Sequence, residues 1–135
     1  MSRKHSDRSV AVEGHKLLAE VNKQLLADPR LWALQDDHPV ITVLKSEMTD
    51  PIIIAKLESF AYLILNIFEI LLVVRPGAMN KREKAEYDTW RFFFHDTVAK
   101  SSIIRRLLED PAVRRLYGSV LLAEYQQVKK QALKP

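Results

Sequence analysis

The stretch IIIAKLESFAYLILNIFEILLVV, residues 52–74, is the most hydrophobic part of the chain and decides the fold. The hydrocarbon of a bilayer needs about 20 apolar residues of helix, so the length of this stretch suits a transmembrane span. The same length also suits the central helix of a protein core. The strongly polar residues within the stretch help to distinguish the two: Lys56, Glu58, Ser59, Asn66 and Glu69.

Most of these polar residues gather on one side of a helix. At 100° per residue the stripe that contains them is roughly 100° wide, and the rest of the circumference is almost wholly apolar. On an insertion scale the three charges and the asparagine largely cancel the gain from the apolar side chains. We therefore expect a core helix wrapped on three sides by other helices, and we favour it over a membrane span. The stripe consists of Ala55, Glu58, Ser59, Tyr62, Asn66, Glu69 and Val73.

Length and composition indicate one domain of the all-α class. The chain has 135 residues, of which 47% are hydrophobic and 28% charged, and only three glycines and six prolines interrupt it. The absence of cysteine excludes disulfides, a thiolate nucleophile and a cysteine zinc site. The charged N-terminus is followed by no continuous apolar segment, which argues against a secretory signal. We expect a cytoplasmic protein of bacterial type, with residues 1–8 flexible.

Polar residues next to proline, or three residues before glutamate, mark several helix starts. Proline suits the first helical position, and the aspartate before it offers an oxygen to the free amides beyond. Asn80 and Glu83 form a variant of the capping box. The sequence predicts helices over 9–28, 51–74, 81–98 and 111–131, with short helices after Pro29 and Ser101. Residues 36–50 form a short helix or a loop on the core, and Pro76 and Gly77 end the long helix. The aspartate–proline pairs are Asp28-Pro29, Asp50-Pro51 and Asp110-Pro111.

Apolar faces on the neighbouring helices match the central one, which predicts a helical bundle of about four main helices plus short ones. Phe92 points away from the face of its helix, so we expect it as an edge contact with a second copy in a homo-oligomer. The face on 81–98 consists of Tyr87, Trp90, Phe93, Phe94 and Val98. The face on the last helix consists of Val113, Leu116, Tyr117, Val120, Leu121 and Val128, with Glu124 among them.

Asp88, Arg91 and His95 share one helix face at spacings of three and four residues. The carboxylate and the imidazole are residue types for acid/base catalysis, and the arginine for gripping an anion. A solvated helix face offers the same spacing, and no further residue completes a triad or metal set. We favour the solvated face, and we expect no catalytic residue and no cofactor.

Asn66, Glu69 and Glu124 are candidate buried polar residues because apolar residues surround each of them. Two inward carboxylates could hold a metal in a bundle, but the dimetal sites of bundles need Glu-x-x-His pairs, which this chain lacks. We favour pairing of Glu69 or Glu124 with an arginine, or with a donor on Tyr62, Asn66 or Trp90.

The second half of the chain is basic, with 12 Lys/Arg against 7 Asp/Glu in residues 81–135, a net charge of +5. Arg105, Arg106, Arg114 and Arg115 flank the turn at Asp110 and are candidate contacts for an anion such as DNA phosphate. The acidic residues at the entrance of the following helix oppose this interpretation, because they repel phosphate. A solvated basic face explains the same residues.

Three segments in this order resemble small bacterial helical proteins classed as domains of unknown function: NIFEILLVV (66–74), DTWRFFFHDT (88–97) and SSIIRRLLED (101–110). The resemblance covers roughly residues 50–125 and implies a helical fold, with no activity to transfer. We expect a self-associating interaction or regulatory module whose protein partner the sequence does not identify. A nucleic-acid-binding regulator is the second interpretation, a membrane-associated protein the third and an enzyme the last.

Overall fold

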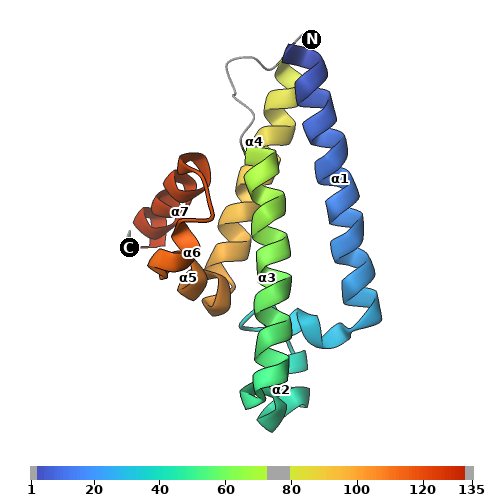
Figure 1. Cartoon of the computed structure of the whole chain (residues 1–135), viewed down its shortest axis with the longest axis vertical. Coiled ribbons are helices and arrows are strands. Elements are labelled where there is room, and N and C mark those ends of the chain that lie inside the picture. Colours follow the sequence, from blue (N-terminus) through green and yellow to red (C-terminus); the bar gives the residue numbers. More distant parts are fainter. Residues whose placement is uncertain (1–2, 73–79, 133–135) are drawn as a thin grey trace.

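A computed structural model describes the backbone of residues 3–72 and 80–132 and the side chains of residues 14–72 and 80–131. Four long helices, α1 (Arg3–Ala27), α3 (Pro51–Leu72), α4 (Lys81–Ala99) and α7 (Ser119–Ala132), form the body of the molecule (Figure 1). No strand occurs in these residues, so the predicted all-α bundle is confirmed. Short elements join the long ones: η1 (Pro29–Leu34), α2 (Val40–Leu44), η2 (Lys45–Thr49), α5 (Ser102–Glu109) and α6 (Pro111–Arg114).

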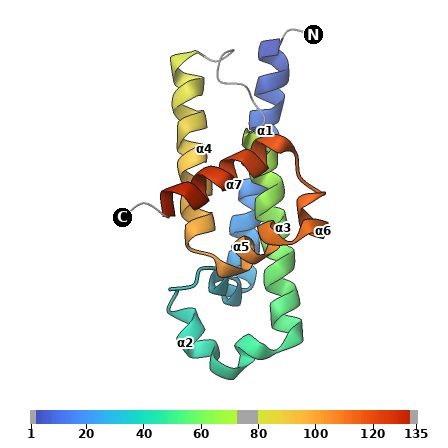
Figure 2. The ribbon, with the colours of Figure 1, turned by 90° about the vertical axis from the view of Figure 1, so that its left-hand side faces the viewer.

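Helix α3 is the centre of the bundle. It contacts α1, α4, α5, α7 and the two 3-10 helices, and α7 lies across α3 and α4 (Figure 2). Leu65 is 0% exposed, whereas its neighbour Asn66 is exposed, as the predicted polar stripe requires. By length and composition alone α3 could also span a membrane. Of the apolar 18-residue segment of α3 that meets this criterion, 39% is buried inside the protein. The predicted helix end at Val73 and Val74, and the stop at Pro76 and Gly77, lie outside the described residues.

The predicted helix starts are confirmed by hydrogen bonds. Each aspartate before a proline accepts the backbone N–H two residues further on, at 3.2 Å for Asp28, 2.8 Å for Asp50 and 2.9 Å for Asp110. Asn80 and Ser101 accept the N–H three residues on, at 2.9 and 3.2 Å. The Arg30 side chain also binds the Asp28 carboxylate, and this hydrogen bond lowers the pKa of Asp28. These side chains therefore satisfy amides that have no partner inside their own helices.

The prediction of one continuous helix over 111–131 is wrong. The chain forms α6 and α7 instead, separated by a turn that includes Tyr117 and Gly118. The Gly118 N–H donates to Oε1 of Glu69 on α3 at 2.8 Å, so it is not available to an intrahelical carbonyl. Leu116, within the break, is 67% exposed and Val120 is 39% exposed, against the predicted face, whereas Leu121 and Val128 are buried as predicted and Tyr125 is buried as well.

Other boundaries also differ from the prediction. Helix α1 begins at Arg3 rather than Ser9, and residues 1–2 of the expected flexible segment lie outside the described residues. Residues 36–50 take the short-helix alternative, as α2 and η2. Gly14 is buried where α1 crosses α3, and a Cβ atom there would lie 2.3 Å from Cδ2 of Leu71. A glycine inside a helix is therefore explained by the close approach of the two helices.

A hydrogen bond from Tyr125 links α7 to the end of α5. The tyrosine O–H donates to Oε1 of Glu109 at 2.5 Å, and Lys129 Nζ binds the same oxygen at 2.9 Å. The Tyr125 hydrogen bond, followed by that of Lys129, lowers the pKa of Glu109, and burial raises the pKa of Tyr125. The contact therefore stabilises the folded state most at pH values between the ordinary pKa of a carboxyl and that of a tyrosine.

Replacing Tyr125 with phenylalanine should lower the free energy of unfolding by about 1 kcal/mol at pH 7, because a charged but half-exposed acceptor loses its donor. Because the folded-state pKa of Glu109 is lowered, the contribution is present above the ordinary carboxyl pKa and is lost as the pH falls through the folded value. Urea unfolding of both proteins over a pH series measures this. A difference that stays constant down to about pH 3 would contradict the proposed ionic character of the contact.

Candidate functional site

Two of the three residues predicted as a polar cluster meet Glu124 between α4 and α7. Arg91 Nε lies 2.8 Å from Oε1 of Glu124, and His95 Nε2 lies 2.9 Å from its Oε2. The Glu124 side chain is only 13% exposed, so the carboxylate is largely buried and carries two donors. The predicted pairing of Glu124 with an arginine is confirmed. Asp88 is exposed and makes no hydrogen bond or ion pair among the side chains that the structure describes.

Side chains of α7 contact both nitrogens of the His95 ring. Its second nitrogen, Nδ1, lies 3.2 Å from Oε1 of Gln131. Each ring nitrogen therefore faces a side-chain oxygen, to which it donates when it carries a proton. A general base needs a ring nitrogen that faces its substrate. Because protein side chains face both nitrogens, the arrangement suits a structural link between α4 and α7 better than acid/base chemistry. Tyr87 lies near Glu124 on the same side of α4. Burial raises the pKa of Tyr87, and the Glu124 charge raises it further.

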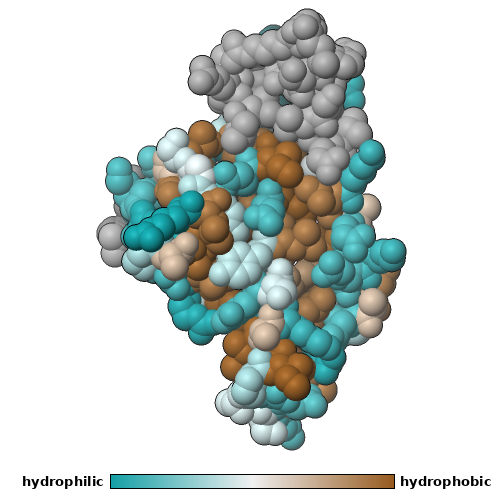
Figure 3. Space-filling view, in the orientation of Figure 1, coloured by the Kyte–Doolittle hydropathy of each residue, from teal (hydrophilic) through white to brown (hydrophobic). Residues whose placement is uncertain are grey.

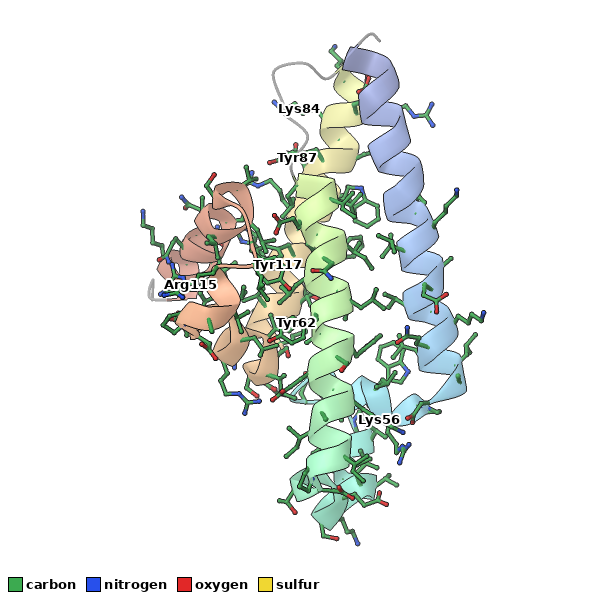
Figure 4. All side chains as sticks on the ribbon, in the orientation of Figure 1. Lys56, Tyr62, Lys84, Tyr87, Arg115 and Tyr117 are labelled. Carbon is green, nitrogen blue, oxygen red and sulfur yellow. The ribbon has the colours of Figure 1, made fainter. Side chains whose placement is uncertain are left out.

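Glu69 and Asn66, the other two candidate buried polar residues, differ from each other. Asn66 is exposed, so its predicted burial is wrong, whereas Glu58, Tyr62 and Glu69 on the same stripe of α3 are partly buried. Glu69 is half-buried. Its Oε1 accepts the Gly118 N–H, and its Oε2 is buried with no hydrogen-bond partner among the described residues. Burial, then the neighbouring Tyr62 and Glu69, raises the pKa of Tyr117 to about 12. Figure 4 shows Tyr62 and Tyr117 on the side of α3 that faces α6 and α7.

No group of three or more His, Asp or Glu side chains that could hold a metal ion occurs in the part of the chain that was described. Glu69 and Glu124 lie on α3 and α7, and each carboxylate has its own protein donor. The two carboxylates therefore act separately in this fold, each fixing α7 or the turn before it to a neighbouring helix.

The four candidate anion contacts divide into two pairs. Arg105 donates to the carbonyls of Val98 and Ala99 at 2.9 and 2.6 Å, at the end of α4, where carbonyl oxygens lack helical partners. Arg106 binds Glu58 on α3 at 2.9 Å. These two guanidiniums therefore stabilise the fold. Arg114 is half-buried close to Glu109, and Arg115 is exposed at the outer edge of the α6–α7 unit (Figure 4).

Phe92, which the sequence predicted as an edge contact, lies on an exposed strip of α4. Phe92 is 66% exposed, and its ring lies 6.0 Å from that of Phe93, which is 46% exposed. Ala85 and Ala99, two turns before and after Phe92 on the same face, are exposed as well. Phe93 was predicted to pack on the core. It is half open because the nearest stretch of α1 packs on α3 and leaves a cavity beside α4.

Comparisons of the chain with protein-family models, with curated proteins and with solved structures find no match. The resemblance of residues 50–125 to small bacterial helical proteins therefore stays a prediction.

Proposed function

We propose that this protein is a helical interaction module that self-associates through the strip on α4 formed by Ala85, Phe92 and Ala99. The observation that carries the proposal is the exposed ring of Phe92. A phenylalanine ring that is 66% exposed leaves most of its apolar surface in water, and burial of such a ring is a main source of interface energy. A second copy is the occupant that can bury it on both partners at once.

The strip has the geometry of a two-fold interface. If two α4 helices pair antiparallel about Phe92, the position seven residues before it in one copy comes opposite the position seven residues after it in the other. Ala85 then faces Ala99 of the second copy, and two small side chains let the helices approach closely. Asp96, four residues after Phe92, is paired with Lys100 Nζ at 3.1 Å, whereas Asp88, four residues before it, is exposed. Phe92 is the bulky apolar residue of the strip, and it lies at the two-fold axis of this pair.

Sedimentation velocity over a concentration series tests the proposal. We expect the wild type to sediment as a dimer at about 100 µM and Phe92→Glu as a monomer, since two carboxylates would meet at the axis. The matched control is Leu116→Glu, because Leu116 is 67% exposed on another face. That variant should remain dimeric. A monomeric wild type, or dissociation of both variants alike, would contradict self-association through α4.

Nucleic-acid binding stays the alternative, supported by the net charge of residues 81–135 and by the exposed Arg115. It is weaker than the first proposal because Arg105 and Arg106 have protein partners. Fluorescence anisotropy with duplex DNA at low and high salt decides it, since phosphate binding must weaken steeply with salt. Membrane association, the third interpretation, is decided by partition between soluble and membrane fractions.

A further inference from the structure

A cavity of about 420 Å³ lies between α1, η1, α3 and α4. Its walls are predominantly apolar and come from all four elements. Figure 3 shows hydrophobic surface between α1 and α3. The volume falls within the range of about 300–1,000 Å³ that is usual for small-molecule sites. Its apolar wall includes Val21, Leu25, Ile64, Phe68, Trp32 and Trp90.

The polar part of the lining carries no net charge. Asp96 and Lys100 both line the cavity, and their side chains form an ion pair at 3.1 Å. Asn22, Gln35 and Thr97 add neutral hydrogen-bonding groups. A ligand carboxylate would have to displace Asp96 from Lys100, and a ligand amine would have to displace Lys100 from Asp96. A hydroxyl group can donate and accept beside the intact pair.

From the volume, the apolar walls and this neutral rim, we propose that the cavity binds an uncharged amphiphile: one medium-length apolar chain that ends in a hydroxyl group. The space equals that of about 14 water molecules in the liquid, enough for a chain of eight carbons and its oxygen. Water is a poor occupant of the apolar part, since a buried water needs two to four polar partners. The ligand would bury its chain between α1 and α3 and leave its hydroxyl near Thr97 and Asp96.

The chain contains two tryptophans, Trp32 and Trp90, and both line the cavity. A bromine atom quenches tryptophan fluorescence at close range, so 8-bromooctan-1-ol is a probe that needs no label on the protein. We expect saturable quenching with a midpoint below about 1 mM for nine non-hydrogen atoms of chain and hydroxyl. Unbrominated octan-1-ol should compete with it. Trp32→Phe and Trp90→Phe should each leave one tryptophan that is still quenched.

The matched pair Val21→Phe and Val120→Phe tests the location. Val21 is half-buried in the cavity wall, whereas Val120 is a partly exposed valine on α7. The first variant should weaken binding of the bromoalcohol at least about tenfold by filling the space, and the second should leave it unchanged. Circular dichroism checks that both are folded. If Val21→Phe does not fold, quenching of Trp90 in Trp32→Phe and of Trp32 in Trp90→Phe decides the location.

Three results would overturn the inference. The first is quenching that does not saturate, the second is equal binding by the two valine variants, and the third is quenching confined to one tryptophan. Octanoate tests the ligand class: it should compete at least about tenfold more weakly than octan-1-ol, because its carboxylate loses solvation beside Asp96. Equal or tighter competition by octanoate would contradict an uncharged ligand. Phe92→Glu should bind the probe like the wild type. Binding of the bromoalcohol can therefore be measured even if the protein does not self-associate.

Discussion

Leu65→Asp should abolish folding of the chain. Leu65 is 0% exposed and belongs to the core cluster at the middle of α3. An aspartate there loses its hydration with no cation provided for it, which costs several kcal/mol in addition to the lost apolar burial. Domains of this size are stable by only about 5–15 kcal/mol, so a large part of the total is removed. Far-UV circular dichroism and urea unfolding measure the loss, and Ile67→Asp, also buried, should behave in the same way.

The control for this prediction is the next residue. Asn66→Asp places the same charge on the same helix, one position further on, but at an exposed side chain. It should change the free energy of unfolding by no more than about 0.5 kcal/mol. Native helicity with an unchanged urea midpoint in Leu65→Asp and Ile67→Asp would show that the assigned face of α3 is wrong.

Glu124→Leu should cost about 2–4 kcal/mol of stability. The carboxylate is largely buried and is the acceptor for Arg91 on one oxygen and for His95 on the other. Leucine fills a similar volume but leaves both donors without an acceptor, and removal of one partner from a buried ion pair is more costly than its net contribution. The Arg91 side chain is 40% exposed and can turn to solvent, which keeps the loss below that of a fully buried pair.

One further variant separates charge from shape at Glu124, and a second, on α4, is the control. Glu124→Gln keeps an acceptor oxygen for Arg91 and should lose only about 1 kcal/mol. Glu86→Leu is the control. Glu86 forms a surface ion pair with Arg82 at 3.8 Å, and both residues lie on α4. This variant should change stability by less than about 0.5 kcal/mol. Urea unfolding of the three proteins measures the series, and an equal effect of Glu124→Leu and Glu86→Leu would contradict the structural role of the cluster.

The features that the sequence predicted are local ones. The aspartates before Pro29, Pro51 and Pro111 act within two residues of themselves, so their helix starts could be read without the fold. The face of α3 followed from a 3.6-residue period that extends over the whole helix, and Leu65 and Asn66 lie where that period places them. In both cases the determining residues are neighbours in the sequence.

The features that the sequence missed depend on contacts between distant residues. The break at Gly118 is fixed by Glu69, which lies 49 positions earlier, and His95 meets Glu124 at a separation of 29. Gly118 followed by Ser119 was the one local signal for the break, since glycine costs about 1 kcal/mol inside a helix and serine favours helix starts. The cavity had no local signal. It arises because α1 packs on α3 and not along α4, which is a property of the assembled helices.

Thiol accessibility on α3 tests the central claim, that this apolar helix is covered by other helices of the same protein. The chain has no cysteine, so Leu65→Cys and Asn66→Cys each carry a single thiol. With a water-soluble maleimide in the absence of detergent, we predict that Asn66→Cys reacts about as fast as it does in urea. Leu65→Cys should react at least about a hundredfold more slowly than in urea, because its thiol is exposed only by opening of the core. Equal rates for the two thiols, or protection of both until the protein is extracted from lipid, would contradict the account.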